Sequence, residues 1–350
     1  MSTITSCFFS GAVGMSYPQR VRRRFLGAGL AAAAIFAASA ALALKSAAAA
    51  DAPYPTKPIR VVVPFAAGSA TDIMMRQLGP RMSDALGQQL IIDNRPGAVG
   101  VIGSEVVMRT PPDGYTLVMS AVSSHSIAPA VRANLPYDVL RDFTPIGRAC
   151  TSANFIVVHP SVPARSLKQL IAFSKTVAGG VSFSSGGTGS SNHLAGEMLR
   201  IRTGANFVHV PYSSVSQALI DTIGGQIPMM VYTVAVLPYV RQGRLRALAV
   251  TSEQRSKQAP EVPTVIEQGV PGMVANSWFG LFGPARLPDP IRDRLYAVLR
   301  DALLAPEVSS KLIEVGLEPS PLSPAEFRAF IERDIAMWKD VVKKSGVKID

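Results

Sequence analysis

The sequence predicts an α/β protein of two lobes, with mixed, mostly parallel sheets and a ligand cleft between the lobes. Between residues 59 and 121, apolar strands alternate with amphipathic helices in the order strand, helix, strand, helix, strand. This order is typical of an open, mostly parallel sheet covered by helices on both faces. A second alternating series begins near Ser152, and only helices are expected after Pro288. A helical tail that returns to the first series completes the two-lobed arrangement.

The first series has clear start and stop signals. A β-branched run, Ile59 with Val61 to Val63, predicts the first strand, and Gly87 stops the helix that follows it. A Pro-Asp-Gly turn that ends at Gly114 introduces the third strand. The expected strands are residues 59–65, 89–93 and 115–121, and the expected helices are residues 71–86 and 103–109.

The second series and the tail follow the same rules. The expected second-series strands are residues 154–159, 181–184, 207–210, 229–231, 245–251 and 278–282, with helices at residues 166–175, 191–202 and 215–223. Each tail helix begins at or near a proline, which suits the first turn of a helix; these helices are residues 290–304, 306–315 and 324–344. We therefore assign residues 51–153 and 275–350 to lobe 1, and residues 154–274 to lobe 2.

The first 50 residues have the pattern of an export signal. A basic segment that includes Arg22, Arg23 and Arg24 precedes an alanine-rich apolar run, and small residues end at Ala50. We expect cleavage near Ala50 and export to the periplasm, by either the general or the twin-arginine route. Translation could also start at Met15. An uncleaved membrane anchor is the alternative, because the apolar run is long enough to span a bilayer.

Composition excludes several classes of function. The net charge is +11, but after the signal the basic residues are scattered, with no run longer than two, so no nucleic-acid partner is expected. Cys150 stands alone once Cys7 is removed, which excludes an internal disulfide. The four histidines have no metal-ligand spacing, and no nucleophile or phosphate-loop motif is present. We therefore predict no metal, no cofactor and no enzymatic activity.

Two glycine- and serine-containing loops, each between a strand and a helix, are the strongest chemical features. The first contains Gly68 and Ser69, and the second is the segment FSSGGTGSSNH at residues 183–193. Such loops expose backbone N–H groups at a helix N-terminus, where the helix dipole favours an anion. In open sheets, ligands lie beyond the carboxyl ends of the strands, so the segments after the strands that end near Ser120 and Val210 also qualify.

Some residues allow two interpretations. Asp72 could cap its helix, or it could meet an amino group or a protonated hydroxyl on a ligand. Tyr212 could stack on a ligand, bind it through the hydroxyl, or pack over Pro211. His159 and His209 lie at strand ends close to prolines, and are interpreted as structural.

Several segments together resemble the Bug family, the extracytoplasmic solute receptors of tripartite tricarboxylate transporters. The similar segments lie in family order along nearly all of the chain after the signal; they include YPTKPIRVVVPFAAGSATD (54–72), IIDNRPGAVGVIGSE (91–105), PPDGYTLVMS (111–120), FSSGGTGSSNHLAGEML (183–199) and HVPYSSVSQALIDTIGGQI (209–227). The resemblance implies a type II periplasmic-binding-protein fold whose lobes close around a small organic acid. It also implies membrane transporter subunits as partners of a monomeric receptor, unless the receptor is an orphan.

The resemblance also implies where the ligand binds. Family members hold carboxylates mainly through backbone amides, hydroxyls and water. Carried onto this chain, the ligand-binding residues are Phe65, Ala67, Gly68, Ser69, Thr71, Asp72, Ser120 and Ser123 in lobe 1, and Ser185, Gly187, Thr188, Ser190, His193, Tyr212 and Ser214 in lobe 2. Ser69 stands where the family usually has glycine, and Ser213-Ser214 where it usually has Lys-Gly, which leaves open whether the ligand is one of the usual dicarboxylates.

The sequence therefore predicts a periplasmic receptor that captures a small carboxylate or dicarboxylate for uptake or sensing. The alternative is an exported enzyme that uses the same cleft, with Asp72 or His193 as the base. The missing nucleophile motif argues against the enzyme.

Overall fold

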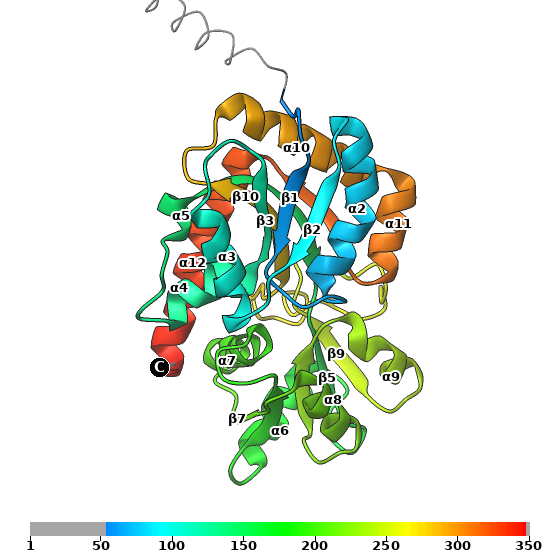
Figure 1. Ribbon diagram of the computed structural model, residues 1–350. Helices are drawn as coiled ribbons and strands as arrows, with labels where there is room; N and C mark the ends of the chain where they lie inside the picture. The colour runs from blue at the N-terminus through cyan, green and yellow to red at the C-terminus, as the bar shows by residue number, and fades with distance from the viewer. Residues whose placement is uncertain (1–53, 348–350) are drawn as a thin grey trace, which may run out of the picture. The chain divides into compact units, whose positions relative to one another are not determined.

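Two mixed sheets with flanking helices form the framework of the protein (Figure 1). The computed structural model describes residues 54–347, and the chain from Lys57 onward forms one unit. The predicted export signal at residues 1–50 lies outside the described residues. Among the residues that are described, no helix is long and apolar enough to cross a membrane.

The first sheet combines strands from both ends of the chain. Its order is β11-β4-β10-β3-β1-β2. The strands are β1 (Ile59–Val63), β2 (Leu90–Asn94), β3 (Thr116–Ala121), β4 (Phe143–Ser152), β10 (Ser277–Pro284) and β11 (Glu318–Leu322). The associated helices and turns are α2 (Ala70–Leu86), η1 (Ala98–Gly100), α3 (Val101–Met108), η2 (Ser123–Ile127), α4 (Ala128–Val131), α5 (Val139–Asp142), α10 (Asp289–Leu304), α11 (Pro306–Glu314) and α12 (Pro324–Ser345). Helix α2 lies beside α10 and α11, whereas α12 lies beside α4 (Figure 1).

The second sheet is built from the middle of the chain, in the order β7-β6-β8-β5-β9. Its strands are β5 (Phe155–Val158), β6 (Val181–Ser185), β7 (Phe207–Pro211), β8 (Met229–Tyr232) and β9 (Arg246–Val250). The helices are α6 (Leu167–Thr176), α7 (Ser191–Thr203), α8 (Val215–Ile223), η3 (Val234–Val236) and α9 (Leu237–Arg241). Helix α7 also packs on α12, so it touches both halves of the framework (Figure 1).

Both sheets are mixed, as predicted, but parallel pairing is less extensive than the sequence suggests. It is restricted to β1 with β2 and β3, and to β6 with β7 and β8. The other strand pairs are antiparallel. They involve the strands nearest the crossings between the sheets, which are β4, β5, β9 and β10. An order of elements along the chain does not reveal such reversals.

Two strands were not expected. Strand β4 begins at Phe143 and contains Pro145 and Gly147, residues that weaken a strand pattern. Strand β11 has the sequence EPSPL and pairs only with β4, at the edge of the sheet, where a proline needs no partner for its missing N–H group. The expectation of helices alone after Pro288 is therefore wrong.

The two sheets are joined where the chain crosses between them. Asn154, which is buried, follows β4, and its Nδ2 donates to the carbonyl of Ala275, 2.6 Å away, just before β10. The N–H of Thr251 donates to the carbonyl of Asn154 (2.8 Å), and the Thr251 hydroxyl donates to the carbonyl of Ala275 (3.1 Å). The crossing segments thus hold one another through buried hydrogen bonds. Our lobe boundaries, 153/154 and 274/275, stay a prediction.

Candidate functional site

The candidate site is built from loops at the carboxyl ends of paired strands. Strands β1 and β3 are neighbours in the first sheet, and β6 and β7 are neighbours in the second. Residues 64–69, here called the α2 loop, connect β1 to α2. Residues 186–190, here called the α7 loop, connect β6 to α7. The fold thus places each loop directly before a helix of several turns, as the sequence predicts.

The α2 loop is fixed by a serine cap and a carboxylate. Ser69 is the N-cap of α2, and its hydroxyl accepts a hydrogen bond from the N–H of Asp72 (3.3 Å). Asp72 reaches back, and its Oδ2 accepts the N–H of Gly68 at 2.9 Å. The N–H of Ile73 donates to the Ser69 carbonyl. Among the described residues, the N–H groups of Ala70 and Thr71 have no partner and remain available to an acceptor.

Asp72 is an anchor of the α2 loop. It is only 2% exposed, and its Oδ2 also accepts Arg76 Nε (2.9 Å), while its Oδ1 accepts Asn94 Nδ2 (3.0 Å). Burial alone raises the pKa of Asp72, but the hydrogen bonds from Arg76, Gly68 and Asn94 outweigh burial and lower it. Because both oxygens are occupied within the protein, the geometry favours the capping interpretation over a direct ligand contact.

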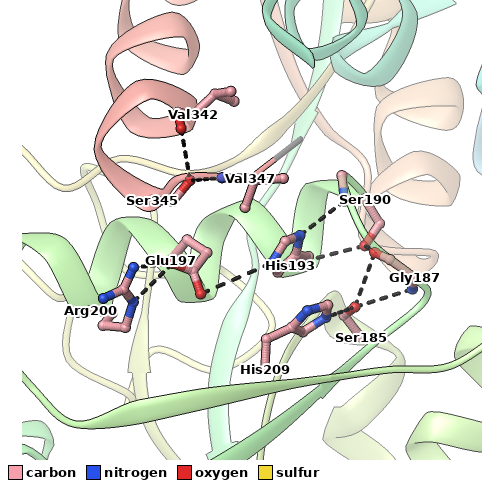
Figure 2. Close-up of polar contacts among 11 residues, drawn as sticks. Ser185, Gly187, Ser190, His193, Glu197, Arg200, His209, Val342, Ser345 and Val347 are labelled. Carbon is pink, nitrogen blue, oxygen red and sulfur yellow. Dashed lines mark hydrogen bonds and ion pairs between the residues drawn. The ribbon is translucent and has the colours of Figure 1, made fainter. Parts of the chain in front are cut away.

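The α7 loop has the same construction, with histidine in place of aspartate. Ser190 is the N-cap of α7, and its hydroxyl accepts the N–H of His193 (3.4 Å) and donates to the Gly187 carbonyl (2.6 Å) (Figure 2). His193 Nδ1 accepts the N–H of Gly189 at 2.9 Å. Gly187 has φ +113°, a conformation that residues with a side chain rarely adopt. In the described structure, the N–H groups of Ser191 and Asn192 have no partner.

A second histidine supports the α7 loop from below. His209 stacks on His193 with ring centroids 3.6 Å apart, and its Nε2 lies 2.6 Å from Ser185 Oγ (Figure 2). Ser185 Oγ in turn accepts the N–H of Gly187 (3.1 Å). Burial lowers the pKa of His209 to about 4. Burial, then His209 and Arg200, lower the pKa of His193 to about 3, so both rings are neutral near neutral pH.

The sequence interpretation of His209 as structural missed its place beside the site. The strand register would have revealed this position. In the parallel β6–β7 pair, His209 lies opposite Phe183, and Phe183 is two residues before Ser185. Its ring is therefore carried on the sheet next to the loop that follows β6. The distance along the chain between residues 183 and 209 conceals this proximity.

The segment after β3 lies largely inside the protein. Ser120 is fully buried, and its hydroxyl is 2.6 Å from Ser124 Oγ and 2.8 Å from His125 Nδ1. Burial lowers the pKa of His125 to about 3. Ser123 is half-buried at the start of η2. A Cβ added to Gly100 would lie 3.0 Å from the Phe65 ring and 3.2 Å from Ser124, so the α2 loop and this segment approach one another at Gly100.

The remaining predicted residues divide by exposure. The side chain of Tyr212 is half-buried, and its hydroxyl donates to Asp221 Oδ2 (2.8 Å), which ties it to α8. Ser214 is exposed and precedes α8 without a side-chain cap bond. Ala67, Gly68 and Thr188 are exposed, Phe65 is half-buried and Thr71 is buried.

Within the described part of the chain, neither a metal-binding cluster nor the groove beside α7 involves the predicted ligand-binding residues. No group of three or more His, Cys, Asp or Glu side chains that could hold a metal ion occurs among residues 54–347. A groove of about 850 Å³ lies between α6, α7, residues 268–271 and the end of α12, and its lining includes Met198, Arg202 and Met337. It is formed by none of the predicted ligand-binding residues.

Comparison with known proteins gives a consistent picture. The family model described as tripartite tricarboxylate transporter family receptor matches residues 74–347. Protein BugT of Bordetella pertussis is 36% identical over 298 residues, which cover 85% of this chain and 91% of BugT. Rpa4515 of R. palustris, solved with adipate, is 32% identical with a TM-score of 0.73 and covers 84% of this chain and 99% of its own. MatC of Rhodopseudomonas palustris, solved with bound malate, is 29% identical with a TM-score of 0.69 and covers 83% and 100%.

Proposed function

This chain belongs to the family of tripartite tricarboxylate transporter receptors, and we propose that it captures a small dicarboxylate at the α2 and α7 loops. Its fold is that of periplasmic binding proteins. Two structural relatives were solved with adipate and malate, and both compounds are short dicarboxylic acids. A ligand of this class is therefore the first to test.

The observation that carries the proposal is the matched pair of helix N-termini. Helices α2 and α7 each begin with a serine cap, and within residues 54–347 the N–H groups of the first two residues of each helix have no partner. Paired N–H donors and the positive end of a helix dipole suit a carboxylate. The exposed hydroxyls of Thr188 and Ser214 add donors at the same ends of the strands.

The enzyme alternative has little chemical support. Asp72 is buried, both of its oxygens accept donors of the protein and its pKa is lowered, so it is a weak base that is fixed to the α2 loop. His193 Nδ1 already accepts the Gly189 N–H, and its pKa of about 3 makes it a weak base. We therefore propose a receptor without catalytic activity.

The receptor is proposed to act in the periplasm as a monomer, after cleavage near Ala50. It would deliver its ligand to membrane transporter subunits, in keeping with a family description that names a transporter receptor. The signal pattern of residues 1–50 and the periplasmic relatives support this location.

The test is a binding screen with charge-matched controls. The protein, expressed from its full chain, is first denatured and its extract examined by mass spectrometry for a co-purified acid. Refolded, ligand-free protein is then titrated with adipate, malate and the neutral adipic diamide. Binding is followed by calorimetry and by thermal unfolding.

At a concentration of about 100 times its dissociation constant, a ligand adds ~2.7 kcal/mol to the free energy of unfolding. We expect one acid to bind and the diamide not to bind. Ligand-free, folded protein that binds no carboxylate would contradict the proposal.

A further inference from the structure

The two loops differ in one chemically important respect, the charge of the side chain that holds them. Each loop follows the pattern Gly-Ser-x-x-acceptor, with Asp72 in the α2 loop and His193 in the α7 loop. In both, the acceptor takes the N–H of the glycine that precedes the serine cap, at 2.9 Å. An aspartate supplies this acceptor together with a negative charge, whereas a neutral imidazole supplies it alone.

We propose that His193 is a specificity-determining positioning residue: it shapes the α7 loop as a neutral acceptor and so keeps negative charge away from the N–H groups that receive the ligand carboxylate. The inference rests on the proposed function, because it assigns a reason for carboxylate binding at that loop. In the α2 loop, Arg76 pairs with the carboxylate of Asp72. Arg200, the cation that acts on His193, already pairs with Glu197, so a carboxylate in place of His193 would stay unpaired and would repel a ligand anion at the α7 loop.

The surroundings of His193 keep the neutral form in place. The ring is 2% exposed and is stacked on His209, which is neutral for the same reason of burial. Because Nδ1 accepts the Gly189 N–H, the proton of the neutral ring lies on Nε2, 4.0 Å from Glu197 Oε1 (Figure 2).

The nearest charge is balanced and lies further back. Glu197 is one helical turn beyond His193, away from the loop, and Arg200 Nη2 pairs with its Oε2 at 2.7 Å. On the packed helix α12, the charged residues at this end, Asp340, Lys343 and Lys344, are exposed. Glu197 is thus paired, and these charged groups of α12 are in contact with solvent.

An independent observation indicates that an acceptor is missing at the start of α7. Asn192, the second residue of the helix, is only 6% exposed, and its Nδ2 has no hydrogen-bond partner within residues 54–347. A buried donor without an acceptor is costly and rare in folded proteins. An anion bound at this turn would supply acceptors for the Ser191 and Asn192 N–H groups, and the unpartnered Asn192 Nδ2 belongs to the same helical turn.

The test compares His193→Asp with His193→Asn, two side chains of equal shape that differ in charge. Dissociation constants for adipate and malate are measured by calorimetry at about pH 7.5, where an introduced aspartate is ionised. We expect His193→Asp to bind at least about tenfold more weakly than His193→Asn. The ratio of the two variants at one pH cancels the titration of the ligand.

Several outcomes would overturn the inference. Equal affinities of the two variants would show that shape rather than charge matters. A parent protein that binds neither acid when ligand-free would overturn the proposed function and this inference together. If His193→Asp does not fold, as thermal unfolding would reveal, the exposed Thr188 provides a second matched pair, Thr188→Asp and Thr188→Asn, for which the same difference is expected.

Discussion

The α2 and α7 loops share a backbone design but are stabilised by different forces. The α2 loop is held by Asp72, a carboxylate that receives charge-assisted hydrogen bonds from Gly68, Arg76 and Asn94. The α7 loop is held by His193, which makes one hydrogen bond to the loop and is otherwise fixed by stacking on His209. One local geometry can therefore be reached through electrostatics or through packing, and the two solutions should respond differently to pH and mutation.

The side chains that hold the two loops also differ in their exposure to solvent. The partner of Asp72, Arg76, keeps 56% of its side chain in solvent, so this ion pair is screened by water and salt. The rings of His193 and His209 both contact Phe183. Phe183 and His193 are buried. We expect salt to weaken the α2 loop anchor slightly and to leave the α7 loop anchor unchanged.

The largest expected effect is a loss of stability in acid that comes from the α7 loop. The pKa of His193 is lowered to about 3 and that of His209 to about 4, below the value of about 6.5 in an unfolded chain. The unfolded state therefore binds more protons, and stability falls as the pH drops from about 6.5 towards 4. By about pH 4.5 we expect His193 alone to remove about 2.7 kcal/mol from the free energy of unfolding, measured by urea denaturation.

Two variants separate this effect from that of the α2 loop. His193→Gln should flatten the loss between about pH 6.5 and 4.5, although the buried His125 and His209 leave a residual slope. Asp72→Asn should leave that window unchanged. The pKa of Asp72 is lowered, so the contribution of Asp72 is present above its unfolded value of about 3.9 and is lost only below it. Identical pH profiles for the parent and His193→Gln would disprove the assignment.

The next effect is on ligand affinity and comes from the glycines of the two loops. Gly187 has φ +113°, and an added Cβ would lie 3.3 Å from the Tyr212 carbonyl oxygen; Gly68 has φ +80° and no atom within 4 Å of an added Cβ. Gly187→Leu should therefore reshape the α7 loop and weaken dicarboxylate binding at least about a hundredfold, whereas Gly68→Ala should cost about tenfold or less.

Gly204 supplies the control for both variants. It has φ +62° at the opposite end of α7, with open space around it, so Gly204→Ala introduces the same kind of backbone strain far from the loop. Its affinity should equal that of the parent while its stability falls by about 1 kcal/mol. Calorimetry on all three variants checks the order, and a Gly187→Leu protein that binds as tightly as the parent would exclude the α7 loop from the site.

The sequence predicted the framework of both loops because their signals are local. Strand, serine and helix follow one another within a few residues at Ser69 and at Ser190, and the structure confirms both helices to within a residue at their starts. The two unexpected strands, β4 and β11, were hidden by prolines and by pairing partners far away in the chain. The local order of elements cannot reveal a pair such as Glu318 with Thr151.

The roles of the polar side chains were less predictable for the same reason. The sequence identified Ser120, Ser185 and Tyr212 as candidate ligand-binding residues, and these assignments stay predictions. The structure shows their hydroxyls bonded to His125, His209 and Asp221, respectively. Which of several serines faces the solvent depends on strand register and side-chain direction, and neither is encoded in a short motif.

The smallest expected effect compares the two serine caps. Ser69 Oγ makes one bond to its helix, to the Asp72 N–H, whereas Ser190 Oγ accepts the His193 N–H and also donates to the Gly187 carbonyl at 2.6 Å. Ser69→Ala should reduce the free energy of unfolding by about 1 kcal/mol, the usual loss for an N-cap, and Ser190→Ala by about 2 kcal/mol. Urea denaturation at neutral pH measures both. Equal losses would mean that the Gly187 bond adds nothing; a larger loss at Ser190 would show that the loop held by a neutral ring depends more on its cap than the loop held by a carboxylate.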